Sequence, residues 1–423
     1  MKSVFHRRFG GASGSRTLME DLGRALARGD SLMLGGGNPS RIPRVEELLR
    51  ARMREIVEDA DAFGRAFGQY DPPQGDPAFI DALADMLRRE CGWQVSARNI
   101  ALTTGSQSAF FALFNLFAGD CVDGIHRRIL FPLTPEYIGY ADLGLSDGLL
   151  RAFRPGIQML DHRMFKYRVD FDALRVDADV GALCVSRPTN PTGNVLTDDE
   201  IDRLARIAAG RGLRLVIDNA YGVPFPGILF TGATPVWTED LIVCMSLSKL
   251  GLPAVRTGIV IAAEEVIDAL TGVTAATGLA PSSVGPALMV DMVRSGRITQ
   301  LAREVIGPYY RARMQQALEW LHAALDGCDY RVHVPEGAIF LWLWLPGLPV
   351  SSQIVYERLK ERGVLVLSGH WFFPGLDEPW AHRDECLRLT YSQDPDVVRR
   401  GIAIMGEEIR RLCDGAGRGG PAR

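Results

Sequence analysis

The sequence lacks the marks of a secreted, membrane-bound or nucleic-acid-binding protein. Its seven cysteines are scattered without Cys-x-x-Cys spacing, which argues against a disulfide framework or metal site and favours reduced thiols in a cytoplasmic protein. No apolar run is long enough to span a membrane, and residues 1–16 are basic without an apolar core, so no secretory signal is expected. The net charge of −4 indicates no surface for nucleic acid.

The chain has 423 residues, enough for two or three domains, with an ordinary apolar content of 47% and a charged content of 23%. Short apolar strands alternate with helices or loops between residues 182 and 262, which predicts an α/β fold with a mostly parallel sheet. We expect a large domain over residues 45–305 and a smaller α/β domain over 306–423. An N-terminal arm, 1–44, would contribute to the smaller domain, and the Gly-rich tail 414–423 would be disordered.

The most informative stretch is Ser246-Leu-Ser-Lys249, which directly follows the apolar run Leu241–Met245. Ser246, Ser248 and the later Arg256 could together hold a phosphate dianion. A partly desolvated lysine near another cation is a nucleophile close to neutral pH and can form a Schiff base with an aldehyde. An aldehyde and a phosphate on one ligand suggest pyridoxal 5'-phosphate. Taken alone the pattern is weak, and a surface lysine in a serine-rich turn would be the better explanation of it.

Polar residues also follow other predicted strands. Gly105-Ser-Gln107 stands between a strand and a buried helix, where helix amides favour an anion, although Ser106 could simply be an N-cap. Asn190 lies in a Pro- and Gly-rich loop after the strand 182–186, and Asp218 ends the strand 213–218, where it could pair with a pyridine nitrogen or cap a turn. Because ligands bind at the carboxyl ends of strands in open α/β sheets, this shared placement favours one site.

Some residues remain ambiguous from the sequence. Arg388 lies inside the apolar strand pattern Cys386–Tyr391, so it needs an anionic partner, either a nearby carboxylate or the carboxylate of a substrate. Tyr137 could stack on a flat ring or be half-buried packing. Three glycines in Ser31–Pro39 would let the backbone approach a ligand, or form a plain turn.

Together these motifs resemble the fold-type I pyridoxal-phosphate enzymes, and among them the class I and II aminotransferases. Asn190-Pro-Thr-Gly193, Asp218-x-x-Tyr221, Ser246-x-Ser-Lys249 and Arg388 stand in the family's order and at about its spacing. The resemblance covers about residues 15–410, and longer strings such as Ser186–Asn194 resemble the valine–pyruvate subgroup of that family.

The resemblance implies a role for each matching residue. Lys249 would carry the cofactor and move the proton, Asp218 would pair with the pyridine nitrogen, and Tyr137 would stack on the ring. Asn190 and Tyr221 would bond the phenolic oxygen. The cofactor phosphate would be held by Gly105, Ser106, Gln107, Ser246, Ser248 and Arg256.

The substrate and partner assignments also come from the resemblance. Arg388 would bind the substrate α-carboxylate, with Asn190 and the backbone of Gly36 and Gly37 nearby. Tyr70 resembles the tyrosine that reaches the phosphate of the partner subunit, which implies a homodimer with shared sites.

The implied reaction is ping-pong amino transfer between a small neutral amino acid, valine or alanine, and pyruvate or 2-oxoisovalerate. No second arginine matches a side-chain carboxylate, and Trp342, Trp371, Phe372 and Phe373 suggest an apolar mouth. Departures from the subgroup pattern at Thr104, Ala254, Val255 and Ser368 leave an alternative open: β- or γ-elimination, replacement or cyclisation with the same cofactor. A regulatory protein on this fold is disfavoured, because residues 1–30 are too short for an added DNA-binding segment.

Overall fold

The computed structural model describes residues 3–10, 20–21, 23 and 31–418. Its central sheet runs in the order β2–β11–β10–β9–β8–β4–β3, with β5 beside β4. Strands β10, β9, β8 and β4 are parallel, whereas β11 runs antiparallel to β10 and β2. The strands are β2 (Ile100–Thr104), β3 (Gly119–Asp120), β4 (His126–Phe131), β5 (Leu150–Ala152), β8 (Val180–Ser186), β9 (Arg214–Asp218), β10 (Leu241–Ser246) and β11 (Thr257–Ile261).

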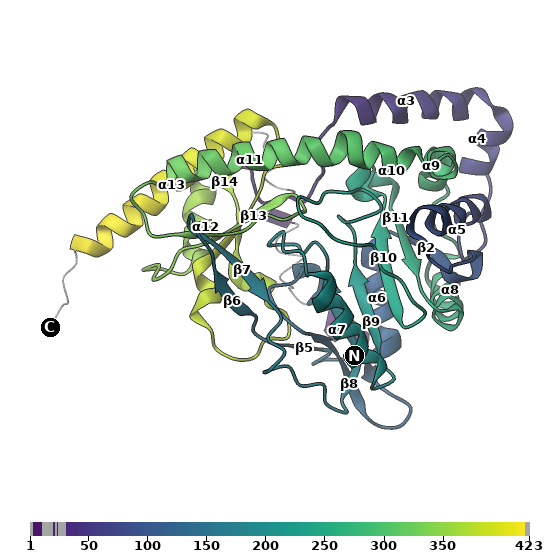
Figure 1. The fold of residues 1–423 in the computed structure, drawn as a ribbon, viewed down its shortest axis with the longest axis horizontal. Coiled ribbons are helices and arrows are strands. Elements are labelled where there is room, and N and C mark those ends of the chain that lie inside the picture. The colour runs from purple at the N-terminus through teal and green to yellow at the C-terminus, as the bar shows by residue number, and fades with distance from the viewer. Residues whose placement is uncertain (1–2, 11–19, 22, 24–30, 419–423) are drawn as a thin grey trace.

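Helices cover both faces of this sheet (Figure 1), so its strands are apolar on both faces. Along β9, Leu215 and Ile217 enter a core that includes α5 and α7, while Val216 enters a second core with α6 and α8. The helices of this part are α3 (Pro43–Glu58), α4 (Ala60–Phe67), α5 (Pro77–Cys91), α6 (Ser106–Phe117), α7 (Asp198–Ala209), α8 (Glu264–Gly278), α9 (Val284–Arg294) and α10 (Arg297–Leu301). The short helix α1 (Val4–Phe9) lies near α6, with the ring of Phe9 6.4 Å from that of Phe111, and Arg8 donates to the carbonyls of Gly144 and Ala141.

A second sheet runs in the order β15–β16–β13–β12–β7–β6. Its strands are β6 (Gly156–Met159), β7 (Met164–Arg168), β12 (Arg331–His333), β13 (Phe340–Trp344), β15 (Leu367–Ser368) and β16 (Cys386–Thr390). It packs with α11 (Gly307–Ala324) and α12 (Ser352–Glu361), and α13 (Pro395–Arg418) packs against these two helices. From the N-terminal arm, β1 (Leu32–Met33) pairs in parallel with β14 (Val364–Leu365).

The second sheet takes strands from both sides of residue 305. Strands β6 and β7 come from residues 156–168, yet β7 pairs with β12 in the C-terminal part of the chain. A hairpin far from its sheet in sequence carries no local sign of the sheet it joins, so this pairing could not be expected from the sequence.

Three element bounds also differ from the sequence prediction. The helix expected over 45–66 is broken at Asp59, whose carboxylate caps α4 by accepting from the amides of Asp61 and Ala62. The strand expected from Pro335 begins at Phe340. Helix α13 continues to Arg418, although the tail was expected to be disordered from 414, because its glycines weaken a helix without ending it. The remaining tail, 419–423, and most of the arm before residue 31 lie outside the described residues.

Within the described part of the chain, no helix is both long enough and apolar enough to cross a membrane.

Candidate active site

A cavity of about 530 Å³ opens where β8, β9 and β10 end. Its polar lining comes from segments that follow these strands, joined by residues of the arm and of β16. The predicted site residues that line it are Gly37, Ser106, Gln107, Tyr137, Asn190, Asp218, Tyr221, Ser246, Ser248, Lys249, Arg256 and Arg388. Of the residues that the strand-end argument named, Asn190, Asp218 and Lys249 line this one cavity.

Three predicted residues do not line the cavity. Gly36 stands between two lining residues, Gly35 and Gly37. Gly105 lies against the guanidinium of Arg256, since a Cβ there would come within 2.2 Å of its Nη2. Tyr70 is 83% exposed and lies away from the cavity of its own chain.

Lys249 follows β10 in a short 3₁₀ turn, Ser248–Leu250. Its Nζ donates to the carbonyl of Gly37 at 2.7 Å and lies 5.2 Å from the centre of the Tyr221 ring. Burial, helped by the positive charges of Arg388 and Arg256 and opposed by Asp218, lowers the pKa of Lys249 to about 8. A neutral amine, and hence a nucleophile or base, is therefore accessible near neutral pH.

Asp218 ends β9 at the floor of the cavity. Its Oδ2 accepts from the hydroxyl of Tyr140 at 2.6 Å, and its Oδ1 accepts from the amide of Ala220 at 3.0 Å. Burial raises the pKa of Asp218, while these two hydrogen bonds and Lys249 oppose the rise. The carboxylate is held in one orientation and would be stabilised further by a cationic ligand group.

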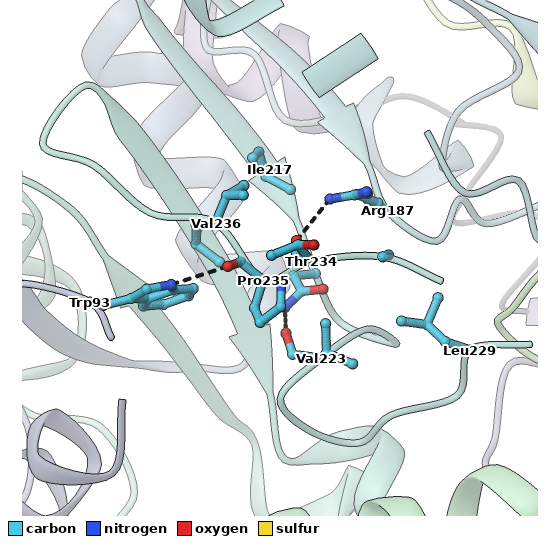
Figure 2. Close-up of a pocket in the computed structure, with 11 residues that line it drawn as sticks. Trp93, Arg187, Ile217, Val223, Leu229, Thr234, Pro235 and Val236 are labelled. Carbon is cyan, nitrogen blue, oxygen red and sulfur yellow. Dashed lines mark hydrogen bonds between the residues drawn. The ribbon is translucent and has the colours of Figure 1, made fainter. Parts of the chain in front are cut away.

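Behind this strand end lies a smaller cavity (Figure 2), whose lining includes Ile217, the residue before Asp218. There Trp93 donates to the carbonyl of Pro235 and Arg187 donates to that of Thr234. Its volume of about 20 Å³ has room for about one water molecule. It is too small for an amino acid, and the side chains around it hold the backbone next to the end of β9 in place.

The corner between β2 and α6 is built to receive an anion. Gly105 has φ +82° and leads into Ser106, the first residue of α6, where free helix amides favour negative charge. Arg256 has φ +51°, a left-handed conformation that is uncommon for arginine and turns its guanidinium against Gly105. Ser246 accepts from the amide of Ser248 at 3.0 Å, which brings both serines to the same corner.

Arg388 lies on β16, in the second sheet, and is 4% exposed. It donates to Asn190 Oδ1 at 2.7 Å and to the carbonyl of Gly35 at 2.6 Å, and its Nε has no partner. Its guanidinium carbon lies 4.1 Å from the centre of the Phe340 ring. No carboxylate of the described residues pairs with it, so the salt-bridge alternative fails and a buried positive charge faces the cavity.

The expected apolar mouth is not formed by the aromatic residues proposed for it. Trp342, Phe372 and Phe373 are buried, and Trp371, which is 37% exposed, does not line the cavity. Phe372 acts indirectly, since its ring lies 5.1 Å from the guanidinium carbon of Arg388. Trp342 lies on β13 itself, and the rings of Phe372 and Phe373 pack against it. The sequence does not reveal this packing, so these residues were expected at the cavity mouth.

Sequence reasoning also missed part of the lining. These residues are Gly35, Asn38, Ile138, Gly139, Ser186, Pro188, Ala220 and Pro253. Gly139 is needed beside Tyr137, because a Cβ there would come within 2.3 Å of the tyrosine ring. Tyr140, which orients Asp218, could have been noticed as a second tyrosine three residues after Tyr137.

Comparisons with known proteins agree with this geometry. Residues 152–404 match the family model described as aminotransferase class I and II. The chain is 48% identical over 409 residues to the valine–pyruvate aminotransferase of Escherichia coli, covering 97% of this chain and 98% of that protein.

Solved structures give the same result. A putative amino-acid aminotransferase from Psychrobacter arcticum superposes with a TM-score of 0.96 and 44% identity, covering 98% of this chain and 99% of that one. A valine–pyruvate aminotransferase from Salmonella typhimurium superposes with a TM-score of 0.88 and 47% identity, covering 95% and 100%. The fold class expected from the sequence is therefore confirmed.

Proposed function

This chain belongs to the class I and II aminotransferase family, and from that premise we propose that it transfers an amino group between valine or alanine and pyruvate or 2-oxoisovalerate. It is an aminotransferase of fold type I. The alternative of elimination, replacement or cyclisation is not favoured, because the similar proteins that have been named are aminotransferases.

We propose pyridoxal 5'-phosphate as the cofactor, because the residues present fit its parts. When bound, it supplies an aldehyde that condenses with amines and a ring that accepts the electrons left by a departing α proton. The cradle made by Gly105 against Arg256 suits a phosphate, with Ser106, Gln107, Ser246 and Ser248 as further donors. Asp218 suits a protonated ring nitrogen, Tyr137 a ring face, and Asn190 with Tyr221 the phenolic oxygen.

Lys249 is the proposed base. Its lowered pKa of about 8 leaves a useful neutral fraction at neutral pH, and its position at the cavity wall lets it take and return a proton at the substrate's α carbon. The hydrogen bond to Gly37 fixes the amine between the arm and the strand ends. Arg388, with Asn190 and the backbone of Gly36 and Gly37 nearby, would hold the α-carboxylate so that the α carbon faces Lys249.

The proposed substrate class rests on the charged side chains that line the cavity. Lys249, Arg256 and Arg388 are the cationic side chains among the lining residues, and all three already have proposed roles. A side-chain carboxylate would then have to leave water without a cation to receive it, which is costly. Small neutral donors fit this lining.

We therefore expect valine and alanine to be used at least about tenfold better than aspartate or glutamate, as kcat/KM, since an unpaired charge costs more than the roughly 1.4 kcal/mol of one decade. Aliphatic donors should differ less among themselves, because one methylene changes discrimination by only about 1–3 kcal/mol. The measurement is 2-oxo acid formation from a donor panel at fixed pyruvate. A strong preference for aspartate, or consumption of a γ-substituted donor without 2-oxo acid, would contradict the proposal.

We also propose a homodimer with shared sites, supported by the exposure of Tyr70 away from its own cavity. In such a dimer Tyr70 would donate to the phosphate bound by the partner, and a hydrogen bond to a charged group contributes about 1.5–3 kcal/mol. Tyr70→Phe should therefore weaken cofactor binding roughly tenfold or more by fluorescence titration.

Subunit mixing tests the sharing directly. At a cofactor concentration too low to load Tyr70→Ala protein, mixing this variant with Lys249→Ala protein should restore activity, because a hybrid dimer has one site without either lesion. No recovery under conditions of subunit exchange, or sedimentation of a fully active monomer, would rule out shared sites.

A further inference from the structure

A second carboxyl group, Glu136, is buried close to Asp218. Glu136 directly precedes Tyr137 and is 1% exposed. Its Oε1 accepts from the amide of Ser186 at 2.9 Å, and its Oε2 lies 2.5 Å from the hydroxyl oxygen of Ser186. No Lys, Arg or His among the described residues forms an ion pair with it, whereas Glu200 and Glu408, which are buried as well, each pair with an arginine.

Two hydroxyls connect this carboxyl to Asp218. Ser186 and Asp218 are register partners at the ends of the neighbouring strands β8 and β9. The hydroxyl of Tyr140 donates to Asp218 at 2.6 Å and lies 3.4 Å from that of Ser186. Glu136, Ser186, Tyr140 and Asp218 thus form one buried polar chain, whose closest surroundings include the apolar residues around Tyr140.

Glu136 and Asp218 do not both ionise readily, because they are buried close together: each negative charge disfavours the other, and neither is well solvated. Asp218 faces the cavity, with Lys249 near it and a cationic ring nitrogen proposed opposite. Glu136 faces Asp218, Tyr140, Tyr137 and Cys184, none of which offers a positive charge. The proton of the pair therefore belongs on Glu136.

We propose that Glu136 is a positioning residue that remains a neutral carboxylic acid while Asp218 is ionised, and that its proton, donated to Ser186, directs the hydrogen bonds toward Asp218. With Ser186 accepting from Glu136, its own hydrogen points to the oxygen of Tyr140, whose hydrogen points to Asp218. Every hydroxyl then donates once, in one direction. The inference rests on the proposed function, in which Asp218 faces the ring nitrogen of the cofactor.

The pH range follows from the surroundings of Glu136. Burial, with the charge of Asp218 adding to it, raises the pKa of Glu136 to about 8 against the opposing hydrogen bonds from Ser186. Glu136 is therefore neutral at pH 6–7 and ionises as the pH rises through about 8. A folded-state pKa above the unfolded value means that the native chain binds more protons between the two values. This group's contribution to stability therefore declines as pH rises from the ordinary pKa of 4.5 to about 8.

The test is infrared spectroscopy of the full chain, with and without pyridoxal phosphate, for the carbonyl band of a neutral carboxyl group. The wild-type minus Glu136→Gln difference spectrum should show this band at pH 6–7, and the band should fade through about pH 8. Glu408→Gln is the matched control: Glu408 is also buried but lies within 3.8 Å of arginines 358, 362 and 411, so its replacement should not remove the band.

A second variant keeps the carboxyl group in place. Ser186→Ala removes the acceptor of its proton, so the band should move in frequency, which a purely structural role of Glu136 does not require. In the cofactor-loaded protein, any absorption change of the bound cofactor near pH 8 that comes from Glu136 should disappear in Glu136→Gln.

The outcomes separate the two proposals. A wild-type chain without the band at pH 6–7, or a band unchanged in both Glu136→Gln and Ser186→Ala, would overturn the inference. The band present in a chain that binds no pyridoxal phosphate would refute the proposed cofactor while leaving the neutral acid established.

Discussion

Lys249→Ala protein should lack the borohydride-reducible covalent bond to pyridoxal phosphate that the wild-type chain forms. The phosphate corner, built from Gly105, Ser246 and Arg256, does not depend on Lys249, so the variant should still bind the cofactor non-covalently. Its transaminase activity should fall by at least about 10²–10⁴-fold, the range typical for loss of a general acid or base. Borohydride reduction followed by peptide mass mapping measures the bond, and single-turnover kinetics measures the activity.

The chain supplies a matched control in Lys166. This lysine is also buried, and burial lowers its pKa, but its Nζ donates to the carbonyl of Val195 and pairs with Glu336, away from the cavity. Lys166→Met should keep the covalent bond. Other lysines of the sequence, Lys2 and Lys360, serve as internal references in the peptide map. A reducible bond that persists in Lys249→Ala protein would show that another amine carries the cofactor.

The position of the site was predictable because it depends on local patterns repeated at several strand ends. Ser106, Asn190, Asp218 and Lys249 each follow an apolar run, and parallel strands bring their carboxyl ends to one edge. Each pattern alone had an ordinary explanation. Their common position after strands favoured a shared site over these ordinary explanations. For this reason the fold class and most of the lining could be expected from the sequence.

The support behind the site was not predictable, because it depends on partners far apart in the chain. Tyr140 and Asp218 meet only when β4 and β9 enter the same sheet, with β8 between them. Glu136 gives no sign in the sequence that its carboxyl group is buried without a cation. Similarly, β6 and β7 join the second sheet through pairing with β12, which no local periodicity encodes.

Arg388→Ala should weaken amino-acid binding by roughly one to two decades, since hydrogen bonds to charged groups contribute about 1.5–3 kcal/mol. Cofactor binding should change little, because Arg388 comes from β16 in the second sheet and its present acceptors, Asn190 and Gly35, are neutral. Arg388→Lys should recover only part of the loss, because an ammonium group cannot reproduce the planar two-donor contact with a carboxylate. Amino-acid and cofactor titrations of the three proteins measure these differences.

An amine without a carboxylate makes the test specific. 2-Methylpropylamine has the side chain of valine but nothing for Arg388 to hold, so wild-type and Arg388→Ala protein should react with it about equally. With valine, wild-type protein should react much faster than Arg388→Ala protein. The ratio of wild-type to variant rate for valine, compared with the same ratio for the amine, isolates the contact between Arg388 and the carboxylate. If the substitution weakens valine and the amine by the same factor, Arg388 supports the shape of the cavity through Asn190 and Gly35, and the α-carboxylate is bound elsewhere.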